Sequence, residues 1–208
     1  MATKTLKYAF AIFLTLVLIV LLRAYLHQPD AYQAKISEPI IFDETKSINN
    51  LSRSIQFETI SHPDYEKFDY DEFQRFLSWL EEEYFQVFKN LEKKYLGETL
   101  LLKWKGEDPS LDPILLTGHY DVVPVRDDAN SIWQENPFSG KIDDEYIWGR
   151  GALDDKSGVI AILEAVEYLL TQDFAPNRTI YLSFGHDEEI GGRRGAGKVA
   201  EFLINEGV

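Results

Sequence analysis

The chain has 208 residues, of which 45% are apolar, and its formal net charge is −14. Its length and apolar content are sufficient for one well-buried domain. The strong negative charge argues against a nucleic-acid partner, because nucleic-acid binding needs a basic surface. The absence of cysteine excludes disulfides and thiolate zinc sites, so any metal must be held by His, Asp and Glu.

The N-terminal segment differs from the rest of the chain. It has 15 uncharged residues, from Tyr8 to Leu22, between Lys7 and Arg23. A transmembrane helix needs about 20 residues, but flanking basic side chains can extend a span by snorkelling. We predict a signal anchor in residues 1–27, with a cleaved signal peptide or a buried core helix as alternatives. Positive charge before the segment favours a cytoplasmic N-terminus. The body would then lie outside the cytosol, on a vacuolar, lumenal or extracellular side, and would be secreted if the segment is cleaved.

Hydrophobic periodicity predicts an α/β fold in the remainder. Residues 28–42 are polar, contain Pro29 and Pro39, and are predicted to form a stalk or linker. We predict helices at 44–57, around Phe73–Leu80, at 157–171 and from Gly195, the second of them capped by Asp69 or Asp71. We predict strands at 99–104, 113–118, 145–148 and 178–185. This alternation indicates a mixed β-sheet flanked by helices and preceded by one N-terminal hydrophobic helix.

Acidic and histidine side chains stand where apolar segments end. His119 and Asp121 follow the strand predicted at 113–118. Residues i and i+2 of an extended chain share a face. Asp121 could therefore accept a hydrogen bond from the N–H of one ring nitrogen. The other nitrogen would then be unprotonated and free to bind a metal or to act as a general base. A polar pair at the end of a loop is the simpler explanation of this motif by itself.

Two further acidic pairs occupy comparable positions. Asp154 and Asp155 lie between a glycine-rich turn and a predicted helix, and Glu188 and Glu189 follow the last predicted strand. Alone, the first pair could cap a helix and the second could form a solvated turn. Sites in open α/β sheets form beyond the carboxyl ends of strands, so all three clusters are candidates to meet. One histidine with several carboxylates suits zinc or a similar cation, and a carboxylate that is not a ligand could act as general base.

Four motifs, taken in chain order, resemble a known family. The segments GHYDVVP, NPFSG, GRGALDDKSG and GHDEEIGG are similar to those of the zinc metallopeptidase family that contains carboxypeptidase S, glutamate carboxypeptidase and aminoacylase. They most resemble its branch of carboxypeptidase S and N-acyl amino acid hydrolases. The resemblance covers residues 45 to 205 and identifies residues 43–208 as a partial metallopeptidase catalytic domain.

The resemblance implies a role for each site residue and two Zn²⁺ ions per complete active site. Carried over by position, His119 would bind one zinc with Asp121 orienting its ring, Asp154 would bridge both ions, Glu189 would bind the second, and Glu188 would be the general base. It also implies a cis peptide bond between Asp154 and Asp155. The reaction would be hydrolysis of an amide bond, in a peptide with a free C-terminus or in an N-acyl amino acid.

Members of this family continue for some hundreds of residues beyond the Glu-Glu motif, so the chain looks truncated after it. The missing portion is expected to hold another acidic ligand, a distal histidine ligand and a lid domain. A homodimer is expected only through that lid domain. His62 is interpreted as a loop residue, and His186 as at most a support for a ligand. The alternative function is a non-catalytic, membrane-anchored truncated module. An acidic calcium-binding domain would leave His119 unexplained, because calcium takes oxygen ligands.

Overall fold

A computed structural model of the chain describes residues 2–27, 40–126 and 132–208. Most of the predicted stalk, residues 28–39, lies outside the described residues. The chain forms two compact units, Met1–Ile41 and Phe42–Val208. We describe them separately.

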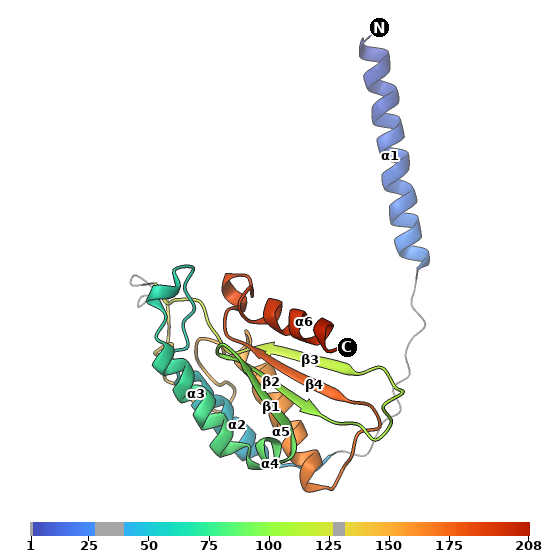
Figure 1. The fold of residues 1–208 in the computed structure, drawn as a ribbon. Coiled ribbons are helices and arrows are strands. Elements are labelled where there is room, and N and C mark those ends of the chain that lie inside the picture. Colours follow the sequence, from blue (N-terminus) through green and yellow to red (C-terminus); the bar gives the residue numbers. More distant parts are fainter. Residues whose placement is uncertain (1, 28–39, 127–131) are drawn as a thin grey trace. The chain divides into compact units, whose positions relative to one another are not determined.

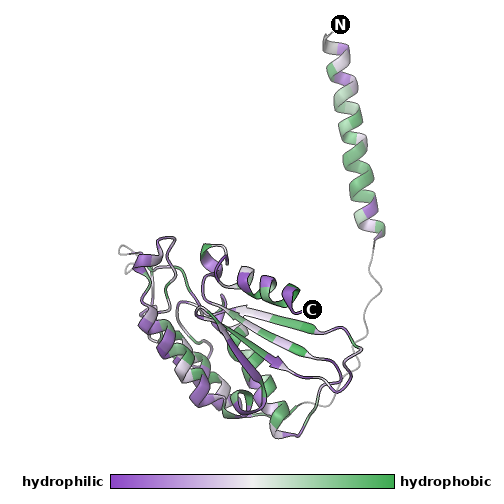
Figure 2. Cartoon of the chain, viewed as in Figure 1, coloured by the Kyte–Doolittle hydropathy of each residue, from purple (hydrophilic) through white to green (hydrophobic). Residues whose placement is uncertain are grey.

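The first unit contains one long helix, α1 (Ala2–Leu26). Within the described residues, Lys4–Leu26 is the single segment with the length and composition to cross a membrane, and a signal sequence has the same properties. Its 23 residues would span about 35 Å at 1.5 Å per residue, against about 30 Å for a bilayer core. Figure 2 shows the predominantly hydrophobic middle of this helix. The helix therefore extends beyond the apolar core that the sequence predicts, at both ends.

The second unit is an α/β domain (Figure 1). Its elements are α2 (Glu44–Ile55), the 3₁₀ helix η1 (Tyr65–Lys67), α3 (Tyr70–Glu83), α4 (Phe85–Asn90), β1 (Glu92–Leu96), β2 (Thr99–Trp104), β3 (Ile114–His119), α5 (Lys156–Thr171), β4 (Ile180–Gly185), the 3₁₀ helix η3 (Glu188–Ile190) and α6 (Ala196–Asn205). The strands form one mixed sheet in the order β1-β2-β4-β3. The predicted fold class is confirmed.

The pairing of β3 with β4 positions the site. These two strands are parallel, whereas β2 pairs antiparallel with both β1 and β4. Helix α5 connects β3 to β4, as a parallel crossover requires. In the register, His119 lies opposite Gly185, so both carboxyl ends meet at one edge of the sheet. The segments that follow these two strands must therefore start side by side.

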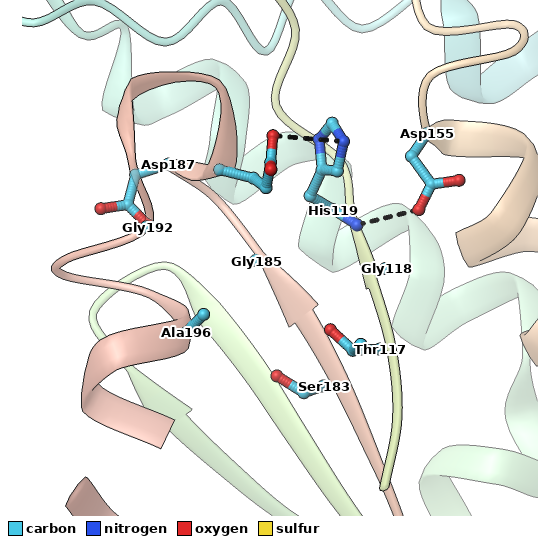
Figure 3. Close-up of a pocket in the computed structure, with 10 residues that line it drawn as sticks. Thr117, Gly118, His119, Asp155, Ser183, Gly185, Asp187, Gly192 and Ala196 are labelled. Carbon is cyan, nitrogen blue, oxygen red and sulfur yellow. Dashed lines mark hydrogen bonds and ion pairs between the residues drawn. The ribbon is translucent and has the colours of Figure 1, made fainter. Parts of the chain in front are cut away.

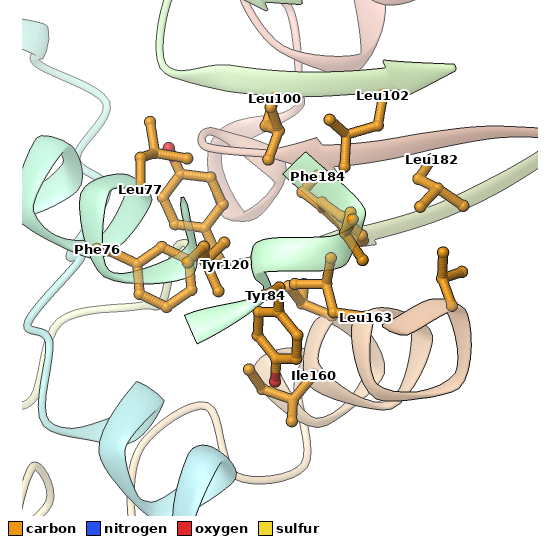
Figure 4. Close-up of a cluster of buried hydrophobic side chains, with 14 of the residues drawn as sticks. Phe76, Leu77, Tyr84, Leu100, Leu102, Tyr120, Ile160, Leu163, Leu182 and Phe184 are labelled. Atoms are coloured by element: carbon orange, nitrogen blue, oxygen red, sulfur yellow. The ribbon is translucent and has the colours of Figure 1, made fainter. Parts of the chain in front are cut away.

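Apolar side chains alternate between the two faces of the sheet. Leu100, Leu102, Leu182 and Phe184 point into the main core, which Tyr120 and helices α3 and α5 complete (Figure 4). On the other face, Leu101 and Tyr181 pack against Val199 and Leu203 of α6. This two-residue alternation is the geometry of a pleated strand covered on both sides.

Strand β3 differs from the buried strand that its aliphatic sequence predicts. Ile114, Leu115 and Leu116 are 40%, 47% and 39% exposed. The reason is that β3 pairs only with β4 among the described residues and forms an edge of the sheet. Its apolar run is therefore half open, and only its C-terminal residue, His119, is buried.

Most predicted elements are present, but the prediction of a strand at 145–148 is wrong. That region contains a single isolated bridge, between Ile142 and Ile147. The Asp143 carboxylate accepts hydrogen bonds from the backbone N–H groups of Glu145 and Tyr146 and from the indole of Trp148. An aspartate that bonds its own following backbone favours a turn over a strand. Helix α4 and strand β1 were not expected from the sequence.

Candidate metal centre

Three short segments bring the predicted site residues to the same edge of the sheet. His119 is the last residue of β3, and Glu188 and Glu189 form the 3₁₀ turn after β4. Asp154 lies in the turn that precedes α5. The parallel register places the first two segments side by side, and the start of α5 supplies the third. This explains why residues far apart in sequence meet here.

The predicted ligands converge. One ligand atom from each of His119, Asp154 and Glu189 can be chosen so that all lie within 4.8 Å of one another. The His119 Nε2 atom is 3.0 Å from Asp154 Oδ1 and 3.7 Å from Glu188 Oε2. His119 is buried, whereas the Asp154 side chain is 77% exposed. The cluster therefore has a buried histidine on its inner side and an exposed carboxylate on its outer side.

The second ring nitrogen of His119 faces Asp121. Nδ1 is 3.3 Å from Asp121 Oδ1 and 3.1 Å from the Asp121 carbonyl oxygen. In the neutral ring, Nδ1–H donates to Asp121, and Nε2 keeps its lone pair toward Asp154. Burial lowers the pKa of His119, but the hydrogen bond and charge of Asp121, together with Asp154, outweigh it and raise this pKa to about 9. Any metal that bound Nε2 would therefore have to displace a proton from His119 at neutral pH.

Asp121 has a second function that the sequence did not predict. It is fully buried, and its two carboxylate oxygens accept hydrogen bonds from the backbone N–H groups of Glu188 and Glu189, at 3.1 Å each. One carboxylate thus holds both the histidine ring and the turn that carries the glutamates. Nothing in the local sequence around Asp121 indicates this contact.

Asp155 holds the same histidine from its backbone side. Its Oδ2 atom accepts a hydrogen bond from the His119 N–H at 3.3 Å (Figure 3). A Cβ at Gly118 would lie 3.0 Å from this oxygen and 3.2 Å from Val159, so glycine permits the close approach. The peptide bond between Asp154 and Asp155 is cis, as the family resemblance implies.

The ammonium group of Lys156 anchors the start of α5. Lys156 is fully buried, and its Nζ donates to the carbonyl oxygens of Ser54 and Phe57, at 2.8 and 2.6 Å. Burial lowers its pKa to about 7. These bonds tie the Asp154 turn to the C-terminal end of α2. The sequence analysis did not identify this residue.

The Glu-Glu turn is also held from its far side. Asp187 is fully buried, and its carboxylate accepts hydrogen bonds from Arg194 N–H (2.8 Å), Gly195 N–H (2.9 Å) and the Tyr65 hydroxyl (3.3 Å). The Arg194 guanidinium stacks on the Tyr65 ring, 3.5 Å from its centroid. The turn therefore has one buried carboxylate on each side, Asp121 and Asp187.

The two remaining histidines of the domain lie outside the ligand cluster. His186 is buried, with Nδ1 2.6 Å from the Thr99 hydroxyl oxygen, and burial lowers its pKa. It packs against the rings of Phe68 and Phe73, and its Nε2 atom lies 3.9 Å from Glu98 Oε2. His62 accepts a hydrogen bond from the Asp64 N–H within its loop, as predicted.

The residues present fit a metal ion by their chemistry. A single imidazole nitrogen faces several carboxylates, and burial and the Asp154 charge raise the pKa of Glu189. Such crowding of acidic groups is relieved by a cation, and His with Asp and Glu is the donor set that zinc accepts. A cavity of about 200 Å³ opens beside His119, lined partly by Glu188 and Asp187.

A mixed sheet that has His119 and Glu189 at the carboxyl ends of its parallel strands, and Asp154 at the start of the following helix, suits a metallopeptidase-type α/β domain. The chain carries a domain of peptidase family M20/M25/M40, and residues 115–208 match the model of that family. The resemblance found in the motifs, including that to the carboxypeptidase S branch, is confirmed.

Individual relatives agree with this assignment. The chain is 45% identical over 172 residues to probable carboxypeptidase S-like 2 of Dictyostelium discoideum, an alignment that covers 76% of this chain and 33% of the relative. It is 35% identical over 214 residues to the N-fatty-acyl-amino acid synthase/hydrolase PM20D1 of Xenopus tropicalis, covering 99% of this chain and 41% of that protein. The chain thus spans about a third of the length of the carboxypeptidase S-like relatives that it matches.

A solved structure shares the fold. An M20 family metallo-carboxypeptidase from Sulfolobus solfataricus superposes with a TM-score of 0.56 at 23% identity, covering 73% of this chain and 32% of that one.

Proposed function

We propose that this domain contributes part of the active site of a zinc-dependent amide-bond hydrolase. The observation that carries the proposal is the convergence of His119, Asp154 and Glu189 at the sheet edge, with Glu188 beside them. The relatives named as carboxypeptidases and as an N-fatty-acyl-amino acid hydrolase support amide chemistry. The substrates would be peptides with a free C-terminus or N-acyl amino acids.

Each residue has a distinct proposed role. His119 Nε2, Asp154 and Glu189 would hold zinc. Zinc bound there would supply Lewis-acid polarisation of the amide carbonyl and would acidify a water molecule. Glu188 would accept the proton of the attacking water and pass it to the leaving nitrogen, which its 60% exposed side chain is free to do. Asp121 would keep the His119 ring in the tautomer that leaves Nε2 bare.

Helix α1 is proposed to anchor the protein in a membrane, with the N-terminus in the cytosol. Its length and composition support a membrane span, and Lys4 and Lys7, which precede the apolar stretch, support the cytosolic N-terminus. Carbonate washing of membranes that contain the chain tests the anchor. We expect the protein to stay with the membrane. A soluble form that begins near residue 27 would instead indicate a cleaved signal peptide.

Paired glutamine variants test the catalytic assignment. In a longer protein that also contains the rest of the catalytic domain, Glu188→Gln should keep the metal content and slow hydrolysis of an N-acyl amino acid or a peptide by about 10²–10⁴-fold or more, since a general base usually contributes that much. Glu189→Gln should weaken zinc binding, because a neutral amide oxygen is a poorer ligand than a carboxylate. Glu145→Gln, an exposed carboxylate in another loop, is the matched control. Loss of metal from Glu188→Gln with full metal retention in Glu189→Gln would reverse the two roles.

A further inference from the structure

The sequence contains two Asn-X-Ser/Thr triplets, which are acceptor motifs for N-linked sugar. They are Asn50-Leu51-Ser52 and Asn177-Arg178-Thr179. The motif is a local pattern, so the sequence does not distinguish them. The tertiary structure does, because a sugar can remain only on a side chain that the folded protein leaves outside.

The Asn50 side chain is committed to the interior. Asn50 is 6% exposed in α2, and its Nδ2 atom donates to Glu164 at 2.7 Å and to the Tyr84 hydroxyl at 3.4 Å. These contacts join α2 to α5 and to the end of α3. A sugar on Nδ2 would remove them and would have to occupy space that α5 already fills. A chain that carries sugar at Asn50 cannot reach this fold.

Asn177 has the opposite environment. It is exposed in the loop between α5 and β4, and within the described residues its side chain makes no hydrogen bond. The backbone around it is fixed, because the Asn177 carbonyl accepts from Asp108 N–H at 2.8 Å and the Thr179 hydroxyl accepts from Gly106 N–H at 3.2 Å. The loop therefore holds its main chain against the domain and leaves the asparagine side chain in solvent.

The position of Asn177 is also compatible with the candidate metal centre. Strand β4 begins at Ile180, just after the triplet, and ends at Gly185, opposite His119. At about 3.3 Å per residue, these six residues separate the loop from the cluster by about 20 Å. A sugar at Asn177 would lie at the end of the sheet away from the metal ligands.

We propose that Asn177 is a site of N-linked glycosylation and that Asn50 is not. The proposal rests on the proposed orientation, in which the domain lies on the lumenal side. The co-reactant is a lipid diphosphate-linked oligosaccharide, the donor used by the secretory pathway. Asn177 Nδ2 forms a bond to C1 of the sugar, the C1–O bond to the diphosphate breaks, and the lipid diphosphate leaves with the electron pair. One Nδ2 proton is released. Transfer takes place before the loop closes over Thr179, and the exposed Asn177 keeps the sugar in the folded protein.

Translation of the full chain in the presence of eukaryotic secretory membranes tests this inference. We expect one glycosidase-sensitive increase in apparent mass. Asn177→Gln and Thr179→Ala should abolish it, whereas Asn50→Gln and the conservative Thr179→Ser should retain it. Because peptide N-glycosidase converts the modified asparagine to aspartate, mass spectrometry should find that conversion at position 177. A mass shift that survives Asn177→Gln, or that Asn50→Gln removes, would overturn the inference.

One added variant separates the site from the orientation. Gly97 lies in the exposed β1–β2 turn at φ +64°, a conformation that asparagine tolerates, and Glu98 and Thr99 follow it. Gly97→Asn therefore creates a new acceptor triplet. The new triplet is tested in a double variant that carries both Gly97→Asn and Asn177→Gln. If this double variant is glycosylated and the wild type is not, the inference about Asn177 is overturned but the lumenal orientation stands. No modification of either chain would overturn both. Zinc titration of the same variants is independent of these outcomes, so failure here does not count against the proposed metal chemistry.

Discussion

The buried carboxylate of Asp121 accepts a hydrogen bond from the backbone N–H of Glu188 at 3.1 Å. The same carboxylate lies 3.3 Å from the His119 ring. Two halves of the candidate site, one at the end of β3 and one after β4, are thus held by a single side chain. Asp121 therefore fixes the histidine and the glutamate turn relative to each other, in addition to the register of the two strands.

Asp121→Asn should therefore disturb both halves at once. The amide nitrogen would face an N–H donor of the turn, or the ring nitrogen, in place of an acceptor oxygen. We expect zinc affinity to fall by about 10–100-fold, as is usual when the partner of a ligand is lost. Isothermal titration with Zn²⁺ measures this change. Asp108→Asn, an exposed carboxylate that accepts from Ser110, is the control. Equal zinc affinity in both variants would contradict the role of Asp121.

The raised pKa of His119 predicts a pH dependence of metal binding. At pH 7 the metal-free ring is protonated, since its pKa is about 9. Zinc must displace that proton, so the apparent affinity should rise by about tenfold per pH unit up to that pKa. Titrations in buffers of different ionisation enthalpy should show proton release on binding. Release of no proton at pH 7 would mean that His119 is already neutral.

The same group links stability to pH in the metal-free protein. The His119 pKa is higher in the folded chain than its ordinary value of 6.5. The protonated ring thus stabilises the fold fully below pH 6.5 and loses this contribution as the pH rises through about 9. Lys156, whose pKa burial lowers to about 7, titrates over an overlapping range with the opposite sign. The proper readout is therefore the difference in Tm between wild type and His119→Gln, which should shrink as the pH rises from 6.5 to 9.

Asp187 should be important for the shape of the Glu-Glu turn. Asp187→Asn replaces one carboxylate oxygen with an NH₂ group, which cannot accept a hydrogen bond from the Arg194 N–H, the Gly195 N–H or the Tyr65 hydroxyl. The change should lower the free energy of unfolding by about 1–3 kcal/mol. Tyr65→Phe removes only the weakest of these bonds, at 3.3 Å, and leaves the ring under Arg194, so its effect should be smaller. Urea denaturation of both variants measures the difference. Equal losses would show that the backbone bonds of Asp187 contribute nothing.

Helix α4 should depend on a cap from another helix. The Tyr84 side chain, at the N-cap position of α4, caps none of the N–H groups of this helix. Instead, Glu167 of α5 accepts from Gln86 N–H at 3.1 Å and Val87 N–H at 2.9 Å. Glu167→Ala should lower the free energy of unfolding by about 1 kcal/mol, the usual loss of an N-terminal cap. Exposed Glu82→Ala on α3 is the control for loss of a surface carboxylate. A stability loss no larger than that of the control would show that Glu167 does not cap α4.

The local pattern of residues by itself determined the main elements, and the resemblance of its motifs to a known family supplied the candidate ligands. Helices α2, α3, α5 and α6 and strands β2, β3 and β4 follow from the spacing of apolar residues and from caps such as Asp69. Position at element ends marks three polar clusters as candidates to meet, and the family resemblance implies His119, Asp154 and Glu189 as the ligands among them. These features are short-range, so they can be read along the chain without knowing what packs against it.

Only the tertiary structure decided which groups meet across long sequence separations. Asp121 reaches the turn after β4, and Glu167 caps a helix 80 residues away, because the sheet and α5 bring these segments together. Whether an apolar strand is buried also depends on its neighbours, as the exposed face of Leu115 in β3 shows. Asn50 and Asn177 share the same acceptor pattern, and only packing against α5 separates the buried one from the exposed one. Burial and long-range contact are properties of the assembled fold, since they depend on segments that the local pattern does not contain.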